Sequence, residues 1–558
     1  MKIKFQLRLV FTMQAVLLAL AAWRNMHQLN PDAIAYCRIA GYYATSQWEL
    51  AVTGYWGPLL SWLMVPLLKA GCAPLVAARV VMAMSGVVFL LGAVAVFRAF
   101  RLPRLALVAG AWVAMGWSVF WSVRHITPDL LMAGWVALAL GATIKAMLTP
   151  FGHECVPRRT IAAGIWWGLA YLSKAVALPL AGLATMGLAW LALHERGKPR
   201  REVTRRLGEI WLCLAVIAAP WVGVLSHHYG KFTFSTTGPI AHALAGPGEE
   251  ARYHPAMVTL HRPEAGRVTQ WEEPSRMAYR TWSPLESWAS FSHQLDVMGG
   301  NAATIARWLG PVALGWLPGE ANGPPQLRFI GFDLCGWTLV GMGAAWIALV
   351  RRRSRATARM WTWALLPVVG LGGLYLPFWV QREETRYFYP AFPFLWVLVV
   401  GTVGWLTRSA RKARRRASRR ICFWGAGLSF AIPALVWLGV ALNGIPNPAS
   451  RAAHELAVHV QSSDSHGPLA GSGQLPGGRT GLYLAFMLRE SWLGDAALAT
   501  PADFAAVGAQ RVVVRRGSVQ AEAFARDRDW QALPEVEGVA SAVQLFHLMP
   551  MKSPARAK

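Results

Sequence analysis

The chain has 558 residues, of which 55% are hydrophobic and 29 are tryptophan, a composition that excludes an ordinary soluble protein. Its formal net charge of +27 does not indicate nucleic-acid binding, because Lys and Arg lie in short clusters between apolar segments. Such clusters are typical of the cytoplasmic loops of a membrane protein. The six cysteines show no paired spacing, so neither a disulfide framework nor a zinc cluster is expected.

The amino-terminal segment predicts a membrane helix that starts on the cytoplasmic side. Lys2, Lys4 and Arg8 precede an apolar run over residues 9–23. The run ends in Ala-Leu-Ala, which also fits a signal-peptidase site. A retained helix is favoured, because the segments that follow need an anchor to set their orientation.

The next segment, residues 24–73, is predicted to be the first outer loop, and its composition is unusual for a connection. It carries the carboxylate of Asp32 directly after Pro31, and it is rich in Tyr and Trp. An aromatic helix that lies against the membrane and begins with one acid is therefore expected. Asp32 and Tyr36 are four residues apart, which places acid and phenol on one side of that helix. The alternative is that Asp32 only caps the helix.

The rest of the apolar sequence predicts further membrane segments. They cover residues 58–69, which is too short to span, and 74–97, 105–123, 130–148, 161–193, 207–225, 329–350, 360–380, 391–406 and 421–441. Segment 161–193 is broken near Lys174 and Pro179 into two short helices, and a broken helix at membrane depth is tolerated where it lines a cavity. With about eleven spans, every strongly basic loop falls on one side. Residues 226–327 then form a large outer loop.

The carboxyl-terminal part, residues 443–558, has the character of a soluble α/β domain. Helices are predicted over 452–460 and 482–488, and strands over 467–473, 511–517 and 541–549. No catalytic motif is visible in it. The expected role is to stabilise the outer face or to help bind a partner, and residues 1–442 are expected to form the transmembrane catalytic domain.

Four sequence motifs, in order, resemble the GT-C superfamily of integral membrane glycosyltransferases, in particular the bacterial branch of aminoarabinose transferases and protein O-mannosyltransferase-like enzymes. They are an outer loop that opens with Asp32, WSVRHITPDLLMAGW with Asp129, GLAYLSKAVALPL with Lys174, and RYFYPAFP with Arg386 and Tyr387. The fold class that follows is membrane all-α: a polytopic GT-C-like bundle of about eleven transmembrane helices with a small C-terminal α/β periplasmic domain.

The resemblance implies transfer of a sugar from a polyprenyl-phosphate donor to an acceptor at the outer face. Asp32 would act as the general base of an inverting reaction. The cations would hold the lipid phosphate. The alternative is that they only extend to the membrane–water interface, as Lys and Arg at the ends of spans commonly do. The full set of predicted substrate-binding residues is Tyr36, Tyr55, Arg124, Asp129, Lys174, Arg382, Arg386 and Tyr387.

Two departures from the family pattern bear on a metal cofactor. Ala33 follows Asp32 where many relatives have a second acid, and Trp56-Gly57-Pro58 stands where several have Lys or His before Pro. A divalent metal is therefore not supported, and no metal ligand is predicted.

The competing function is a transporter or flippase of lipid-linked sugars, which predicts charged residues within several spans and an inverted repeat. A scaffold that presents the C-terminal domain is a third hypothesis. The expected partners are the lipid bilayer, the polyprenyl-phosphate sugar and an acceptor of unknown type, either protein, lipid or glycan. The absence of an N-x-S/T sequon favours a bacterial inner membrane as the location.

Overall fold

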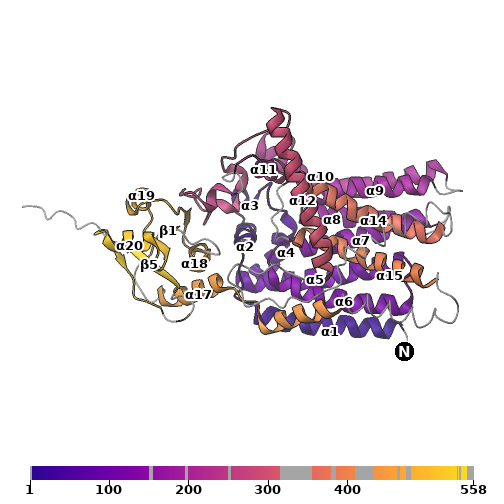
Figure 1. Ribbon diagram of the computed structural model, residues 1–558, viewed down its shortest axis with the longest axis horizontal. Coiled ribbons are helices and arrows are strands. Elements are labelled where there is room, and N and C mark those ends of the chain that lie inside the picture. Colours follow the sequence, from indigo (N-terminus) through magenta and orange to yellow (C-terminus); the bar gives the residue numbers. More distant parts are fainter. Residues whose placement is uncertain are drawn as a thin grey trace, which may run out of the picture.

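A computed structural model describes residues 3–149, 155–194, 199–248, 253–314, 355–378, 385–408, 431–460, 466–472, 479–536, 538 and 542–549. Its long helices lie side by side in a bundle, and a small unit with a sheet lies at one end (Figure 1). The helices of the bundle and its loops are α1 (Ile3–Arg24), α2 (Pro31–Ala44), α3 (Trp48–Ala51), α4 (Pro58–Lys69), α5 (Pro74–Ala99), α6 (Arg104–Arg124), α7 (Asp129–Leu148), α8 (Val156–Ser173), α9 (Ala177–Leu193), α10 (Arg200–Tyr229), α11 (Thr237–Ala243), η2 (Pro255–Met257), η3 (Gln270–Glu272), η4 (Pro274–Arg276), α12 (Trp288–Leu314), α14 (Arg355–Tyr375), η5 (Thr385–Ala391) and α15 (Phe392–Arg408).

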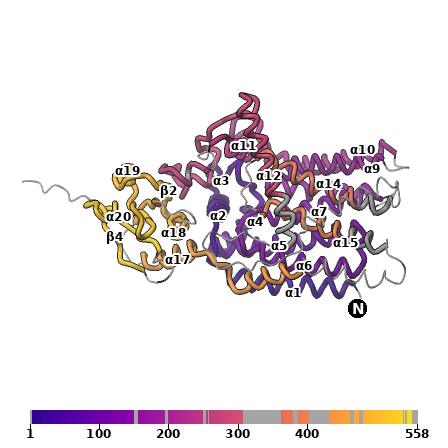
Figure 2. The backbone as a smooth tube through the Cα atoms, viewed as in Figure 1, coloured from indigo at the N-terminus to yellow at the C-terminus, as the bar shows by residue number. Residues whose placement is uncertain are grey.

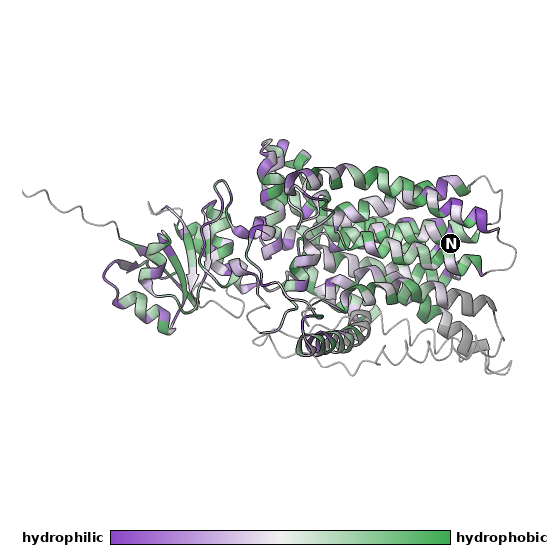
Figure 3. Ribbon diagram, turned by 90° about the horizontal axis from the view of Figure 1, so that it is seen from above, coloured by the Kyte–Doolittle hydropathy of each residue, from purple (hydrophilic) through white to green (hydrophobic). Residues whose placement is uncertain are grey.

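Five of the described helices are long and apolar enough to cross a membrane: α1, α5, α6, α7 and α10. Hydrophobic residues predominate along the bundle, and hydrophilic residues gather toward its ends (Figure 3). These helices coincide with predicted spans 9–23, 74–97, 105–123, 130–148 and 207–225. The predicted total of about eleven spans is not confirmed, because segment 329–350 and part of segment 421–441 lie outside the described residues.

The centre of the bundle depends on glycine at one helix crossing. A Cβ on Gly92 of α5 would lie 2.6 Å from the carbonyl oxygen of Gly134 on α7, and a Cβ on Gly134 would lie 2.7 Å from the nitrogen of Phe89. Small residues let membrane helices approach closely, where packing rather than water exclusion holds them together. The close α5–α7 contact fixes the start of α7, which carries Asp129.

The predicted break at Lys174 is confirmed. Helix α8 ends at Ser173, Lys174 has an extended backbone with φ −155° and ψ 127°, and α9 begins at Ala177. Pro179 lies in the first turn of α9, where proline is compatible with a helix, and it takes no part in the break.

Helix α2 is buried in protein, so the prediction that it lies against the membrane is wrong. Ten of its residues are buried, among them Ile34, Ile39 and Tyr43. It packs against α4 and α5 on the bundle side and against η3 and α18 (Thr480–Leu488) on the other. An apolar helix of this kind needs a cover, and here the large outer loop and the C-terminal unit provide it.

The C-terminal unit contains a five-stranded mixed sheet with the order β2-β1-β3-β5-β4. Strand β1 pairs in parallel with β2 and β3, whereas β5 pairs antiparallel with β3 and β4. The elements are α17 (Pro448–Val460), β1 (Leu469–Ser472), α18, β2 (Trp492–Asp495), α19 (Pro501–Ala506), β3 (Arg511–Arg515), α20 (Val519–Arg526), β4 (Trp530–Ala532) and β5 (Val543–Leu548). The sequence predicted β1, β3, β5, α17 and α18, but missed β2 and β4, which are short. The domain boundary at residue 443 stays a prediction.

Two sets of contacts join this unit to the rest of the chain, and the tube in Figure 2 places it beside α2. The ring of His454 on α17 stacks on His27 at 4.5 Å, just before α2 begins. The backbone nitrogen of His261 donates to Leu493 on β2 over 2.7 Å, so the large outer loop follows the edge of the sheet. This contact covers an edge strand that would otherwise be open.

Candidate active site

Four charged side chains from four separate elements meet at one end of the bundle; we call them the ionic centre. Nη1 of Arg386 on η5 lies 2.6 Å from Oδ2 of Asp32 on α2. Nζ of Lys174, in the α8–α9 break, lies 2.6 Å from Oδ1 of Asp129 on α7. Nε of Arg386 also lies 3.9 Å from Oδ2 of Asp129, so this one guanidinium links the two carboxylates.

The two acids of the ionic centre differ in how far they are buried. The Asp129 side chain is 1% exposed and that of Lys174 is 23% exposed. Asp32 and Arg386 are 16% and 13% exposed. A fully buried carboxylate requires a cation, which is the role of Lys174, whereas Asp32 stays within reach of a ligand.

The alternative that Asp32 is the N-cap is wrong, and Asp129 is not an N-cap either. Helix α2 has Asn30 as its N-cap and Pro31 in the first turn, and Asp32 lies inside that turn. The Asn30 side chain instead accepts a hydrogen bond from the nitrogen of Ile126 over 2.9 Å, which ties the start of α2 to the turn before α7. Asp129 is the first residue of α7 and its carboxylate turns to Lys174. The positive end of each helix adds to the local stabilisation of these acids.

Tyr387 lies beneath both cations of the ionic centre. Nζ of Lys174 is 4.4 Å from the centre of the Tyr387 ring, and the Arg386 guanidinium carbon is 5.6 Å from it. The Tyr375 ring stacks on the other side at 5.0 Å. Cation–π contacts of this kind hold a Lys or Arg head in place.

The predicted phenols of the first outer loop lie near Asp32. Tyr36 is buried and meets Trp56 edge to face at 5.2 Å, and Tyr55 meets the same indole at 4.7 Å. Burial raises the pKa of Tyr36 well above its ordinary value, and the charge of Asp32 raises it further. Burial does the same to the pKa of Tyr55, with Tyr387 and Asp32 adding to it. Both phenols therefore stay protonated and act as neutral neighbours of the acid.

Arg124 also belongs to this region. Its Nη1 donates to Oγ1 of Thr385 over 3.5 Å, directly beside Arg386. The pKa of neighbouring His125 lies well below its ordinary value, first through burial and then through Arg124 and Arg386, so this imidazole is neutral. Arg382, the last predicted phosphate ligand, lies outside the described residues.

The large outer loop contributes residues that the sequence did not single out. The His254 ring lies 6.0 Å from Tyr55 and 4.5 Å from Trp271, and its Nδ1 is 2.8 Å from the Tyr279 hydroxyl. Burial lowers the pKa of His254 to about 4, although the charge of Asp32 acts in the opposite direction. A histidine in a loop gives no sequence signal for such a position.

Of Trp271, Trp282 and Trp288 in this loop, Trp271 alone reaches the site. Trp271 packs against Trp56 at 5.1 Å and Tyr55 at 5.8 Å. Trp282 instead stacks on His242, and Trp288 is 78% exposed.

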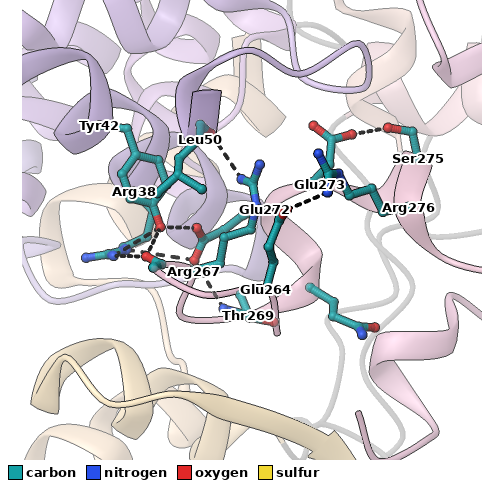
Figure 4. Close-up of polar contacts among 12 residues, drawn as sticks. Arg38, Tyr42, Leu50, Glu264, Arg267, Thr269, Glu272, Glu273, Ser275 and Arg276 are labelled. Carbon is teal, nitrogen blue, oxygen red and sulfur yellow. Dashed lines mark hydrogen bonds and ion pairs between the residues drawn. The ribbon is translucent and has the colours of Figure 1, made fainter. Parts of the chain in front are cut away.

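A buried polar network fastens the large outer loop to α2 and α3 (Figure 4). Glu272 has no exposed area, and its carboxylate accepts hydrogen bonds from the Tyr42 hydroxyl over 2.5 Å and the Val268 nitrogen over 2.9 Å. Arg267 donates to the carbonyl of Leu50 over 3.0 Å. Burial raises the pKa of Glu272, and the Tyr42 hydrogen bond partly opposes that change. The network positions Trp271, which is adjacent to Glu272.

Gly57 explains one departure from the family pattern. A Cβ at this position would lie 2.1 Å from the carbonyl oxygen of Ser173, the residue before Lys174. Only glycine permits this approach. The first outer loop therefore packs directly on the break that presents Lys174.

Among the described residues, the acids of the ionic centre are paired with cations and are not grouped as a metal site. In the parts of the chain that the structure describes, no three His, Cys, Asp or Glu side chains gather as metal ligands. The carboxylates of Asp32 and Asp129 each contact a cation at 2.6 Å, and a metal would have to break these ion pairs.

Similarity to solved structures is evident despite low sequence identity. The structure of ArnT from Cupriavidus metallidurans bound to undecaprenyl phosphate matches with a TM-score of 0.53 at 15% identity, over 96% of this chain and 97% of that one. The archaeal oligosaccharyltransferase AglB from Archaeoglobus fulgidus, in complex with an inhibitory peptide and a dolichol-phosphate, matches with a TM-score of 0.51 at 14% identity, over 92% of this chain and 69% of that one. The chain has the GT-C fold.

The predicted resemblance is thus confirmed for the fold, and the chain is a multi-pass membrane protein. No family model matches the sequence, and no curated protein matches it either. The GT-C fold by itself does not decide the chemistry.

Proposed function

We propose that this chain transfers a glycosyl group from a polyprenyl-phosphate sugar to an acceptor, with inversion, and that Asp32 is the general base. The observation that carries the proposal is the ionic centre: a partly exposed acid, 2.6 Å from Arg386, beside a second cation, Lys174. Two GT-C structures similar to this chain were determined with undecaprenyl phosphate and dolichol-phosphate bound, so a lipid phosphate is the ligand chemistry that fits these cations.

The cations act on the leaving group. Negative charge accumulates on the phosphate as the glycosidic bond to it breaks, and fixed cations stabilise that charge. Lys174 and Arg386 are these fixed cations. Arg124 lies beside Arg386, because its side chain donates a hydrogen bond to the adjacent Thr385. Because both cations now contact carboxylates, the donor phosphate has to exchange with those contacts as it binds. A phosphate leaves without protonation, so no general acid is required.

Asp32 acts on the acceptor. Its side chain is 16% exposed, in contrast to 1% for Asp129, so it is the acid that an incoming hydroxyl can reach. As the hydroxyl oxygen bonds to the anomeric carbon, its proton passes to a carboxylate oxygen of Asp32. Asp129 instead keeps Lys174 and Arg386 in place.

Aromatic side chains form a wall beside the acid. The rings of Tyr55, Trp56 and Trp271 contact one another at 4.7 to 5.8 Å. Sugar C–H faces stack on such rings, and the wall would align either the donor sugar or a glycan acceptor. We place this end of the bundle, with the C-terminal unit, on the periplasmic side of a bacterial inner membrane.

The test is transfer of a labelled sugar from synthetic polyprenyl-phosphate donors to envelope fractions by purified protein in proteoliposomes. Asp32→Asn should abolish transfer, whereas Asp296→Asn, which changes an exposed acid of α12, should leave it intact. Normal transfer by folded Asp32→Asn would remove Asp32 from its role. Movement of the donor across the bilayer without any transfer would favour the flippase alternative.

A further inference from the structure

A second site lies at the opposite end of the bundle, near the amino terminus. It is a groove of about 890 Å³ between α1, α5, α7 and α8. The end of the groove is lined by Lys4, Arg8, Arg98 and Lys145. These cations come from the start of α1, the last turn of α5 and the last turn of α7, so three helices place them together.

Among the described residues that line the groove there is no Asp or Glu, in contrast to the ionic centre, where each cation meets a carboxylate. The Lys4, Arg8 and Arg98 side chains are exposed, so all three can turn toward an anion. Clustered cations without acids attract a multiply charged or phosphate-bearing ligand.

The rest of the groove is apolar and runs along the helices toward the middle of the bundle. Phe11 of α1, Leu91 of α5 and Leu138 of α7 line it. Leu91 is 46% exposed, although it lies in a span. An apolar channel that starts at a cationic end matches an amphiphile with an anionic head and a hydrocarbon chain.

Two stacked indoles form part of the wall. Trp135 and Trp166 stack in parallel at 5.2 Å with an angle of 8° between their planes. Nε1 of Trp135 is buried and, within the described part of the chain, has no hydrogen-bond partner. A lipid ester or phosphate oxygen is a suitable acceptor for such a donor.

We propose that this groove binds an anionic phospholipid from the surrounding leaflet. Its phosphate lies among Arg8, Arg98, Lys145 and Lys4, and one acyl chain follows α5 past Leu91. Only 28% of the α1 span is buried in the protein, so a lipid can lie against this helix. This inference does not depend on the proposed glycosyl transfer, because the groove and the ionic centre share no residue.

Native mass spectrometry of delipidated protein in detergent tests the proposal, with cardiolipin, phosphatidylglycerol or phosphatidylcholine added in turn. The two anionic lipids should bind at least tenfold more tightly than phosphatidylcholine. Arg8→Gln with Arg98→Gln should weaken anionic lipid binding on the order of 25-fold, about fivefold for each charge. The matched control is Arg201→Gln at the exposed start of α10, outside the groove, which should bind lipid normally.

A second variant separates the groove from general surface charge. Leu91→Trp, at a position that is 46% exposed, narrows the groove and keeps all its cations, so it should lose the bound lipid while the protein keeps its melting temperature in detergent. Equal binding of phosphatidylcholine and phosphatidylglycerol, or normal anionic lipid binding by both groove variants, would overturn the proposal. Displacement of the lipid by millimolar inorganic phosphate would do so as well, because it would indicate a site for free phosphate.

Discussion

The two ends of the bundle both concentrate Lys and Arg, and they use these residues differently. At the ionic centre, Arg386 and Lys174 each lie 2.6 Å from a carboxylate and are mostly buried. In the groove between α1, α5, α7 and α8, Arg8 and Arg98 are exposed, and none of the described lining residues is an acid. Paired and buried cations are held in fixed positions, whereas unpaired and exposed cations adapt to a ligand. The number of Lys and Arg residues does not distinguish the two ends of the bundle, whereas the groups that each cation contacts do.

The largest effect is expected where a buried charge loses its partner. Lys174→Met leaves Asp129, which is 1% exposed, without its nearest cation. We expect a loss of about 3–5 kcal/mol in the free energy of unfolding. Lys174→Met with Asp129→Asn should lose less than the sum of the two single variants, as measured by unfolding in mixed detergent–SDS micelles. Additive losses would show that the two side chains do not form a functional pair.

Removal of a cation should reduce glycosyl transfer only when that cation belongs to the ionic centre. Arg386→Gln removes the guanidinium that links the two acids, and we expect glycosyl transfer to fall about 100-fold, which corresponds to about 2.7 kcal/mol of transition-state stabilisation. Arg201→Gln, an exposed cation at the far end, should transfer at the wild-type rate. Equal losses in the two variants would indicate a general effect of charge on the protein and would break the comparison.

The next prediction concerns the contact between Gly57 and Ser173, the residue before Lys174. Gly57→Ala places a Cβ against the Ser173 carbonyl, so the α8–α9 break has to shift; overpacking of this kind costs about 1–3 kcal/mol. We expect a raised KM for the lipid donor as Lys174 moves. Gly41→Ala on α2 has open space around its Cβ, so it should leave KM unchanged and should not reduce stability, because Ala favours a helix over Gly. Similar kinetics for the two variants would rule out a role for this contact.

The smallest effect concerns pH. The pKa of His254 falls from 6.5 to about 4 in the folded protein, so the folded state favours the neutral ring. Its contribution to stability is complete above pH 6.5 and is lost as pH falls from 6.5 toward about 4. The melting temperature of wild type should therefore drop more steeply over this window than that of His254→Gln. Parallel pH curves would contradict the burial of this imidazole.

The sequence predicted much of the fold and part of the site. Apolar length and basic loops predicted the helices that are now α1, α5, α6, α7 and α10, because hydropathy requires only local composition. Lys174 was predicted because the break in the apolar segment around it can be recognised from the sequence. His254 and Glu272 were missed, since a lone charged or polar residue in a long loop carries no periodic signal. The burial of α2 was also missed, because its cover comes from residues far along the chain.

The sequence by itself determined that this is a membrane protein with an acid after its first apolar segment and cations in later motifs. The tertiary structure alone decided which acid meets which cation: Arg386 with Asp32, 354 positions apart, and Lys174 with Asp129, 45 apart. It also decided that Asp129 is enclosed while Asp32 is accessible. The physical reason is that composition sets where a segment is stable, whereas the energy of a charge depends on its neighbours and its distance from water, which only the packed chain defines.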